Sequence, residues 1–131
     1  MIEDALLRHF ELWAAGHDDP SLKESWLALF ADDCTVEEPV GSEPQAGVQS
    51  KGWDMGHSDE RRVFLEPLTV VASPDGREAA TVVRIRMVTN DGEVEFRPIG
   101  FWTGTDDGRI QSSRIFGVSS QMGPDAWPPG E

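Results

Sequence analysis

Three evenly spaced Asp-Gly pairs constrain the fold of this chain more than any other feature. They stand at positions 75–76, 91–92 and 107–108, between runs rich in Val, Ile, Phe and Arg. Asp-Gly readily adopts the positive φ angles of tight hairpin turns. The spacing therefore predicts four antiparallel strands in a meander, at about 62–72, 78–89, 93–105 and 109–119. Alternation within these strands predicts one strongly apolar sheet face.

Two amphipathic helices are predicted ahead of the meander. Apolar residues recur at helical spacing from Ile2 to Trp13, and Gly16 is a natural terminator, which predicts a helix over residues 2–15. A second helix is predicted to run to about Phe30. It begins either with an Asp19 cap before Pro20 or with a capping box formed by Ser21 and Glu24. A looser third helix, weakened by glycines, is predicted within 48–60.

These elements predict one α+β domain. A chain of 131 residues is large enough for one core but too small for two. We expect the helices to pack on one face of a curved antiparallel sheet and to leave a pocket between the layers. The domain is expected to span residues 1–122, with a Pro-rich, extended tail over 123–131.

Charge and cysteine content exclude several classes of function. The chain has 24 Asp and Glu against 11 Lys and Arg, for a net charge of -13. This charge opposes binding to nucleic acids and to anionic membrane surfaces. The lone Cys34 cannot form an internal disulfide, and no secretory leader or membrane-spanning run is recognisable. We therefore expect a reduced, cytoplasmic setting.

Glu38 is the first candidate for chemistry. If residues 34–40 are extended, Cys34, Val36, Glu38 and Val40 share the inward face while Glu37 points outward. Removal of a carboxylate from water raises its pKa toward neutrality, which suits a general acid or base. The same residues also fit a solvated Glu-Glu pair at a strand end, so the pattern leaves both interpretations open.

Three segments resemble a known family. They are ADDCTVEEPVG at 31–41, the following GSEPQAG at 41–47, and DDGRIQSSRIF at 106–116. Together with the order of the elements, they resemble the ketosteroid isomerase family of the nuclear transport factor 2-like (SnoaL-like) superfamily. The resemblance implies a conical barrel, a homodimer and a catalytic carboxylate on an apolar cavity. Because this fold carries many functions, the fold by itself does not define the reaction.

The resemblance implies a general base but not the usual oxyanion hole. Ketosteroid isomerase is a standard example of an Asp base facing a Tyr and a protonated Asp. The base position falls on Glu38, the Tyr position on His9 and the second acid on Gly100, and the chain has no Tyr. Loss of one oxyanion donor costs on the order of 3 kcal/mol, so the usual scheme would be inefficient. His9 is expected to replace one donor, in a protonated form favoured by the Glu38 carboxylate. Without the resemblance, the same histidine fits a half-buried helix residue.

A larger set of residues is predicted to line the pocket and bind substrate. These are Phe30, Trp53, Met55, Val83, Ile85, Met87, Phe96, Pro98, Gly100, Trp102, Ser113 and Ile115. The two tryptophans fit core packing as well. Glu66 is a possible second acid and equally fits a solvated sheet edge. The three histidines lack metal-ligand spacing, so we expect no metal, and no cofactor motif is present.

The sequence leaves three functions open. The leading one is a cofactor-free enzyme that uses Glu38 for proton transfer on an apolar steroid- or polyketide-like substrate, giving isomerisation, elimination or cyclisation. The second is an epoxide hydrolase or cyclase in which Glu38 works with a second acid, either His9 or Glu66. The third is a noncatalytic apolar-ligand-binding module. A homodimer is expected through an outer-face patch that consists of Val82, Ile99, Phe101, Phe116 and Val118.

Overall fold

The first helix lies where the apolar periodicity predicts it. The structure is a computed structural model that describes residues 1–116. Helix α1 (Ile2–Ala15) buries Ile2, Leu6, His9 and Trp13 on one face. The predicted tail over 123–131 lies outside the described residues.

The second helical segment is shorter than predicted. It consists of a 3₁₀ turn η1 (Pro20–Leu22) and helix α2 (Lys23–Leu27). Of the two predicted starts, the Asp19 cap is the one formed, since its carboxylate accepts from the backbone N–H of Ser21 at 3.2 Å. The predicted end near Phe30 is wrong because Phe30 begins strand β1 (Phe30–Glu37), opposite Ile110. Pairing with a distant strand overrides local helix propensity there.

The meander forms with the predicted turns. Strands β3 (Arg61–Ala72), β4 (Glu78–Thr89), β6 (Ile99–Gly104) and β7 (Ile110–Phe116) are antiparallel neighbours, in the sheet order β2-β1-β7-β6-β4-β3. The turn glycines Gly76, Gly92 and Gly108 have φ of 73°, 134° and 87°. Positive φ is favourable for glycine and costly for other residues, which explains the Asp-Gly spacing.

Two features of the sheet differ from the prediction. The third meander strand is divided into β5 (Gly92–Phe96) and β6, because Pro98 between them has no N–H for the ladder. Both parts still pair with β4. The sheet is also mixed instead of fully antiparallel, since β1 runs parallel to β7 and antiparallel to the short β2 (Gln45–Ala46). The long connection between β1 and β7 allows this parallel pairing.

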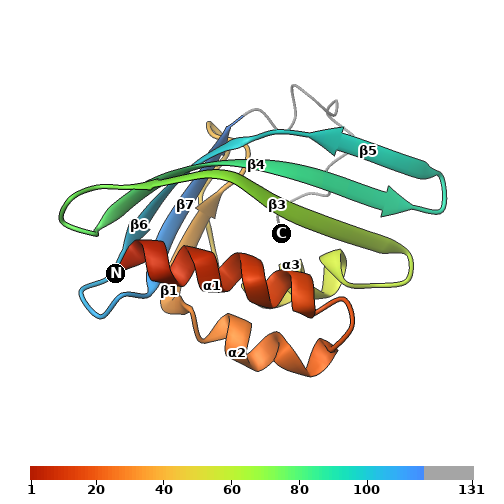
Figure 1. Cartoon of the computed structure of the whole chain (residues 1–131), viewed down its shortest axis with the longest axis horizontal. Coiled ribbons are helices and arrows are strands. Elements are labelled where there is room, and N and C mark those ends of the chain that lie inside the picture. Colours follow the sequence, from red (N-terminus) through yellow and green to blue (C-terminus); the bar gives the residue numbers. More distant parts are fainter. Residues whose placement is uncertain (117–131) are drawn as a thin grey trace.

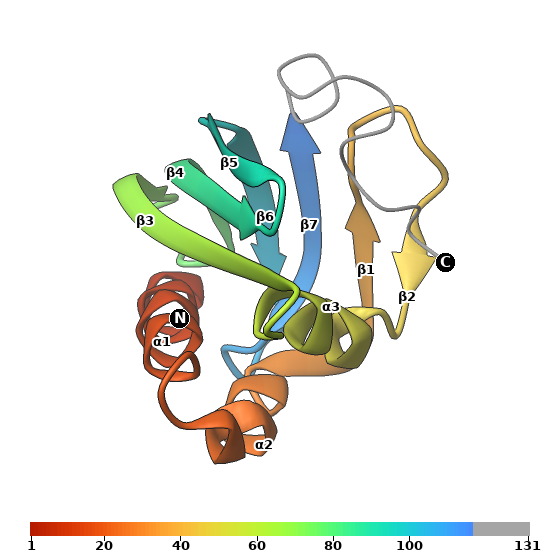
Figure 2. The same ribbon diagram turned by 90° about the vertical axis from the view of Figure 1, so that its right-hand side faces the viewer.

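The helices close a curled sheet. Figure 1 shows α1 lying along β3, with α2 beside it, and Figure 2 shows the strands as an arc whose open side is covered by the helices. Helix α3 (Gln49–Gly56) connects β2 to β3. The buried core joins the inner side of α1 to the apolar face of the sheet. The predicted α+β cone with helices on the concave face is therefore confirmed, apart from the parallel strand.

Candidate active site

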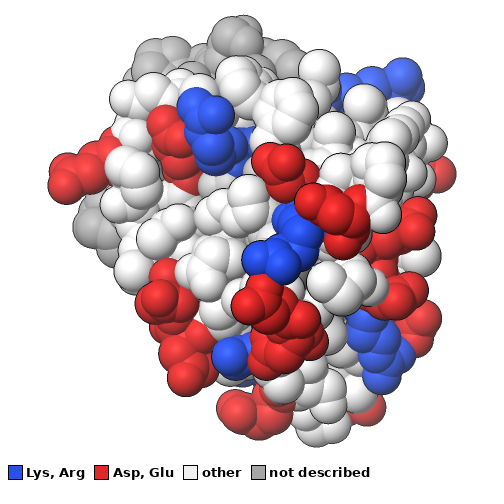
Figure 3. All heavy atoms as spheres, turned by 90° about the vertical axis from the view of Figure 1, so that its left-hand side faces the viewer, with Lys and Arg blue, Asp and Glu red and all other residues white. Residues whose placement is uncertain are grey.

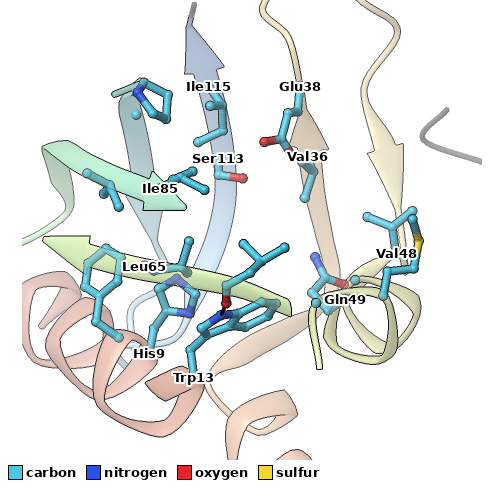
Figure 4. Close-up of a pocket in the computed structure, with 18 of the residues that line it drawn as sticks. His9, Trp13, Val36, Glu38, Val48, Gln49, Leu65, Ile85, Ser113 and Ile115 are labelled. Atoms are coloured by element: carbon cyan, nitrogen blue, oxygen red, sulfur yellow. Dashed lines mark hydrogen bonds between the residues drawn. The ribbon is translucent and has the colours of Figure 1, made fainter. Parts of the chain in front are cut away.

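An apolar cavity of about 260 Å³ lies between the sheet and the helices. Its wall includes residues from β1, the meander and all three helices (Figure 4). The lining consists of His9, Phe10, Trp13, Trp26, Phe30, Val36, Glu38, Val48, Gln49, Lys51, Gly52, Met55, Gly56, Arg61, Val63, Leu65, Thr81, Val83, Ile85, Pro98, Gly100, Trp102, Ser113 and Ile115. Most of these side chains are apolar, so a charged group buried among them is poorly solvated.

Glu38 provides the only carboxylate in this lining, among the residues that the structure describes. Figure 4 shows its carboxylate pointing toward Ser113, which comes from the neighbouring strand β7. Burial against apolar groups raises the pKa of Glu38 to about 7. Glu37 points the other way and its carboxylate pairs with Arg114 at 2.7 Å, as strand alternation predicts. Of the two interpretations of the Glu-Glu pair, the inward Glu38 is the one that the geometry supports.

His9 also lines the cavity, but its ring is neutral, contrary to the predicted protonated form. The indole Nε1–H of Trp26 donates to His9 Nδ1 at 2.8 Å. Because an indole nitrogen is only a donor, Nδ1 must be unprotonated, and a neutral ring then carries its proton on Nε2. Burial lowers the pKa of His9 to about 4. The expectation that Glu38 keeps this ring charged is therefore wrong, because desolvation in the aromatic cluster is the dominant effect.

The position expected to carry the second acid is Gly100, and the Trp102 indole leaves no room there for a larger side chain. The Trp102 indole lies over Gly100 and donates from Nε1 to Thr81 Oγ1 at 2.9 Å. A Cβ at position 100 would stand 2.8 Å from that indole nitrogen and 2.9 Å from the Thr81 hydroxyl. The tryptophan thus occupies the space that a side chain at position 100 would need.

This close packing makes a first prediction. Gly100→Ala should destabilise the fold by about 1–3 kcal/mol, because the added methyl group overpacks a filled site. Gly52→Ala is the matched control, since a Cβ there meets nothing within 4 Å in a helix. That control should gain about 0.5–1 kcal/mol from helix propensity. Urea unfolding measures both values, and a neutral or stabilising Gly100→Ala would refute the packing argument.

Most of the predicted pocket residues line the cavity. Those that do are Phe30, Met55, Val83, Ile85, Pro98, Gly100, Trp102, Ser113 and Ile115. Trp53, Met87 and Phe96 are buried in the core instead. The Trp53 ring packs among Trp13, Trp26 and His57 at centroid distances of 5.7, 5.2 and 3.9 Å. Helical position therefore directs it into the aromatic layer and away from the cavity.

The possible second acid does not reach the cavity. Glu66 is exposed on β3 and its carboxylate lies 3.2 Å from the guanidinium of Arg84. These two residues are register partners on β3 and β4. Alternation places both on the outer face, opposite Leu65 and Val83, which line the cavity. Glu66 thus belongs to the solvated sheet surface.

Sequence reasoning missed the polar residues of the cavity. Gln49 and Lys51 come from α3, and Arg61 is the first residue of β3. The alternation along β3 could have revealed Arg61, because this residue has the same parity as the inward Val63 and Leu65.

Among the described residues, no three His, Cys, Asp or Glu side chains come together as a metal site. None of the described helices has the length and apolar character needed to cross a membrane.

Comparison with known proteins identifies the fold. No family model matches the sequence. The Δ5-3-ketosteroid isomerase from Mycobacterium sp. has a TM-score of 0.72 and 20% identity, covering 92% of this chain and 95% of that one. A Mycobacterium tuberculosis protein in complex with estradiol-17β-hemisuccinate has a TM-score of 0.75 and 22% identity over 92% and 95%. The epoxide hydrolase/cyclase-like enzyme SalBIII has a role in pyran ring formation in the polyether salinomycin. It has a TM-score of 0.73 and 21% identity, covering 90% of this chain and 92% of that one.

These similarities cover nearly the whole chain. The chain therefore has the nuclear transport factor 2-like fold shared by ketosteroid isomerase and SalBIII, and the fold that the sequence resemblance implied is confirmed. At about 20% identity, the likeness defines the architecture, and the reaction must be argued from the site.

Proposed function

We propose that this protein is a small enzyme that moves protons on an apolar ligand, with Glu38 as the general base. The observation that carries the proposal is a carboxyl group with a pKa of about 7 on the wall of an apolar cavity. A base is most effective when its pKa lies near the working pH, and a desolvated carboxylate contributes roughly 10²- to 10⁴-fold. The chemistry uses side chains of the chain itself and no cofactor.

His9 acts as the partner of Glu38 in this proposal. Its Nε2–H is a neutral donor held in one tautomer by the Trp26 indole, and Figure 4 shows its ring bordering the cavity on α1. Neutral imidazoles polarise carbonyl groups in other enzymes, where a lowered pKa keeps the ring uncharged. His9 therefore donates to the oxygen on which negative charge develops, while Glu38 accepts a proton from the adjacent carbon.

The proposed substrate is a steroid- or polyketide-like ketone with a β,γ carbon-carbon double bond. Glu38 removes a proton from the carbon next to the carbonyl group, which leaves a dienolate that His9 stabilises. The carboxyl then delivers a proton, either the one removed or one exchanged with solvent, to a different carbon, which moves the double bond and regenerates the carboxylate. Elimination or cyclisation uses the same first step. The structural neighbours include a Δ5-3-ketosteroid isomerase, which supports a ketone substrate, whereas the epoxide hydrolase/cyclase-like SalBIII supports the alternative, epoxide-opening reaction.

Deuterium transfer tests the proposal without knowledge of the natural substrate. A Δ5-3-ketosteroid is incubated in D₂O, and NMR follows both exchange at the carbon and formation of the conjugated Δ4 product. Because kcat/KM reports the free enzyme, the rate should rise with pH and reach a plateau above a pH of about 7. A ketosteroid that is bound in the cavity but neither exchanges nor isomerises would indicate a binding module instead.

An epoxide-opening reaction is less well supported by the geometry. That chemistry needs a base for the nucleophile and an acid for the epoxide oxygen. The proposed second acid, Glu66, is ion-paired on the outer face, and Glu38 is the only carboxylate lining the cavity within residues 1–116. His9, the other possible acid, is a neutral ring because burial lowers its pKa to about 4. One carboxylate beside a neutral donor suits a proton shuttle better than a two-acid mechanism.

A homodimer through the outer sheet face is also part of the proposal. Ile99, Phe101 and Phe116 are 46, 47 and 36% exposed, and Ile99 is the register partner of both Phe116 and the half-buried Val82. The Phe101 and Phe116 rings are 5.4 Å apart. Val118, the fifth predicted residue, lies outside the described residues. A second copy would cover this exposed patch.

The dimer gives a second prediction. Phe101→Glu should convert the protein to a monomer, because it places a charge in the centre of the proposed interface. Light scattering coupled to size exclusion measures the mass directly. Leu7→Glu is the control, since Leu7 is 50% exposed on α1, away from the sheet surface. A wild-type protein that is monomeric, or a Phe101→Glu variant that stays dimeric, would contradict this interface.

A further inference from the structure

Most basic side chains of this acidic protein are paired with carboxylates. Eight of the eleven Lys and Arg residues have a partner within ion-pair distance, namely Arg8, Lys23, Arg77, Arg84, Arg86, Arg97, Arg109 and Arg114. Figure 3 shows one face, on which Lys and Arg atoms lie beside Asp and Glu atoms. With 24 acids available, an unpaired basic residue is unusual here. In the described part of the chain, Lys51, Arg61 and Arg62 make no ion pair.

Two of these three residues line the cavity. Lys51 lies on α3 and Arg61 begins β3. Arg61 shares the inner face of β3 with Val63, whereas the Arg62 guanidinium lies 5.2 Å from the centre of the Phe64 ring on the other face. The adjacent arginines of one strand thus have different environments, and only Arg61 contributes to the cavity.

Arg61 also has an unsatisfied buried donor. Its Nε atom is buried and has no hydrogen-bond partner among the described residues. A buried donor without an acceptor costs about 1–3 kcal/mol, and more for a charged group. This cost is recovered if the side chain turns this donor toward an acceptor on a ligand in the cavity. Because the guanidinium offers two parallel N–H groups, a planar anion with two oxygens fits it best.

Gln49 provides a second donor of the same kind. Its Nε2 atom is buried without a partner in the described chain, and Figure 4 shows the side chain directed into the cavity from α3. Gln49, Lys51 and Arg61 therefore present donors to one cavity whose remaining walls are mostly apolar. An uncharged hydrocarbon would leave the buried donors of Gln49 and Arg61 unpaired, while the exposed Lys51 would stay solvated.

We propose that the natural ligand is an apolar molecule that carries a carboxylate, which Arg61 binds together with Gln49 and Lys51 while the carbon skeleton fills the cavity. The inference deepens the proposed function, on which it rests for the cavity being the substrate site. Arg61 binds the carboxylate of the ligand, and Glu38 transfers the proton. The site should therefore prefer an acid over its neutral analogue.

A matched ligand pair tests this preference. 1-Naphthylacetate and 1-naphthylacetamide have the same naphthalene ring system. The first carries a carboxylate where the second carries a neutral amide. Isothermal titration should give a Kd for the acid that is roughly tenfold lower than for the amide. In Arg61→Gln, the Kd of the acid should rise about tenfold while that of the amide changes little.

The neighbouring arginine supplies the control. Arg62→Gln removes the same charge from the outer face and should leave the acid preference intact. Equal affinities in the wild type, no saturable binding of the acid up to its solubility limit, or equal losses in both arginine variants would overturn the proposal. In Glu38→Gln the preference should persist. Failure of proton transfer and failure of the carboxylate site are thus observed separately.

Discussion

Replacement of Glu38 by glutamine is expected to lower the rate of deuterium transfer to a ketosteroid by about 10²- to 10⁴-fold. The amide keeps the shape of the side chain but cannot accept a proton. Since the cavity lining holds no other carboxylate within the described residues, no neighbouring group can take over the reaction. Ligand affinity should change little, so the loss should appear in kcat and not in KM.

Glu37→Gln is the matched control for this experiment. Glu37 is the adjacent acid of the same strand, and its carboxylate pairs with Arg114 on the outer side. Its replacement removes the same charge without touching the cavity, and the rate should stay within about threefold of the wild type. Comparable losses in the two variants would assign the effect to net charge or folding instead of catalysis. A fully active Glu38→Gln protein would exclude Glu38 as the base.

The same substitution is expected to stabilise the protein at alkaline pH. The pKa of Glu38 rises from 4.5 to about 7 because burial disfavours the charged form. The folded state therefore binds the proton more tightly than the unfolded state. Stability from the neutral carboxyl is fully present below a pH of about 4.5 and is lost as the pH rises through about 7. The corresponding free energy is about 3 kcal/mol. Glutamine is neutral throughout and avoids this loss.

Urea unfolding of both proteins at two pH values measures the effect. Glu38→Gln should gain about 3 kcal/mol over the wild type at a pH of about 8, relative to their difference at a pH of about 4. His9 has the opposite dependence, because its lowered pKa removes stability as the pH falls from 6.5 through about 4. Both proteins contain His9, so this contribution cancels in the comparison. A pH-independent difference would show that Glu38 is solvated.

Local rules predicted the regular parts of this fold. The Asp-Gly pairs predicted the turns of the meander because glycine's conformational freedom is a property of a single residue. The apolar periodicity predicted α1 because it depends only on residues close together in the sequence. The parallel pairing of β1 with β7 depends on contacts between distant residues and carries no comparable local signal. The division of the third meander strand at Pro98 could have been predicted, since proline has no N–H to donate to the hydrogen-bond ladder of the sheet.

The candidate site was predictable where alternation on one strand decides orientation. Parity offered an inward Glu38 beside an outward Glu37 as one of two interpretations, and this is the arrangement in the structure. The charge state of His9 was not predictable, because it depends on burial in an aromatic cluster and on a hydrogen bond from Trp26 on another helix. Trp53 shows the same limit, since its burial depends on how three helices pack. Tertiary contacts thus set the protonation and packing that sequence patterns leave open.

The pKa of Glu38 tests the central claim most directly. Carbon-13 NMR of protein labelled at the glutamate side-chain carboxyl groups follows each titration, and the signal missing from Glu38→Gln gives the assignment. One glutamate should titrate near a pH of about 7, well above the ordinary value of 4.5. If every glutamate carboxyl titrates between about 3 and 5, the range typical of solvated groups, Glu38 is not the desolvated base that this mechanism requires.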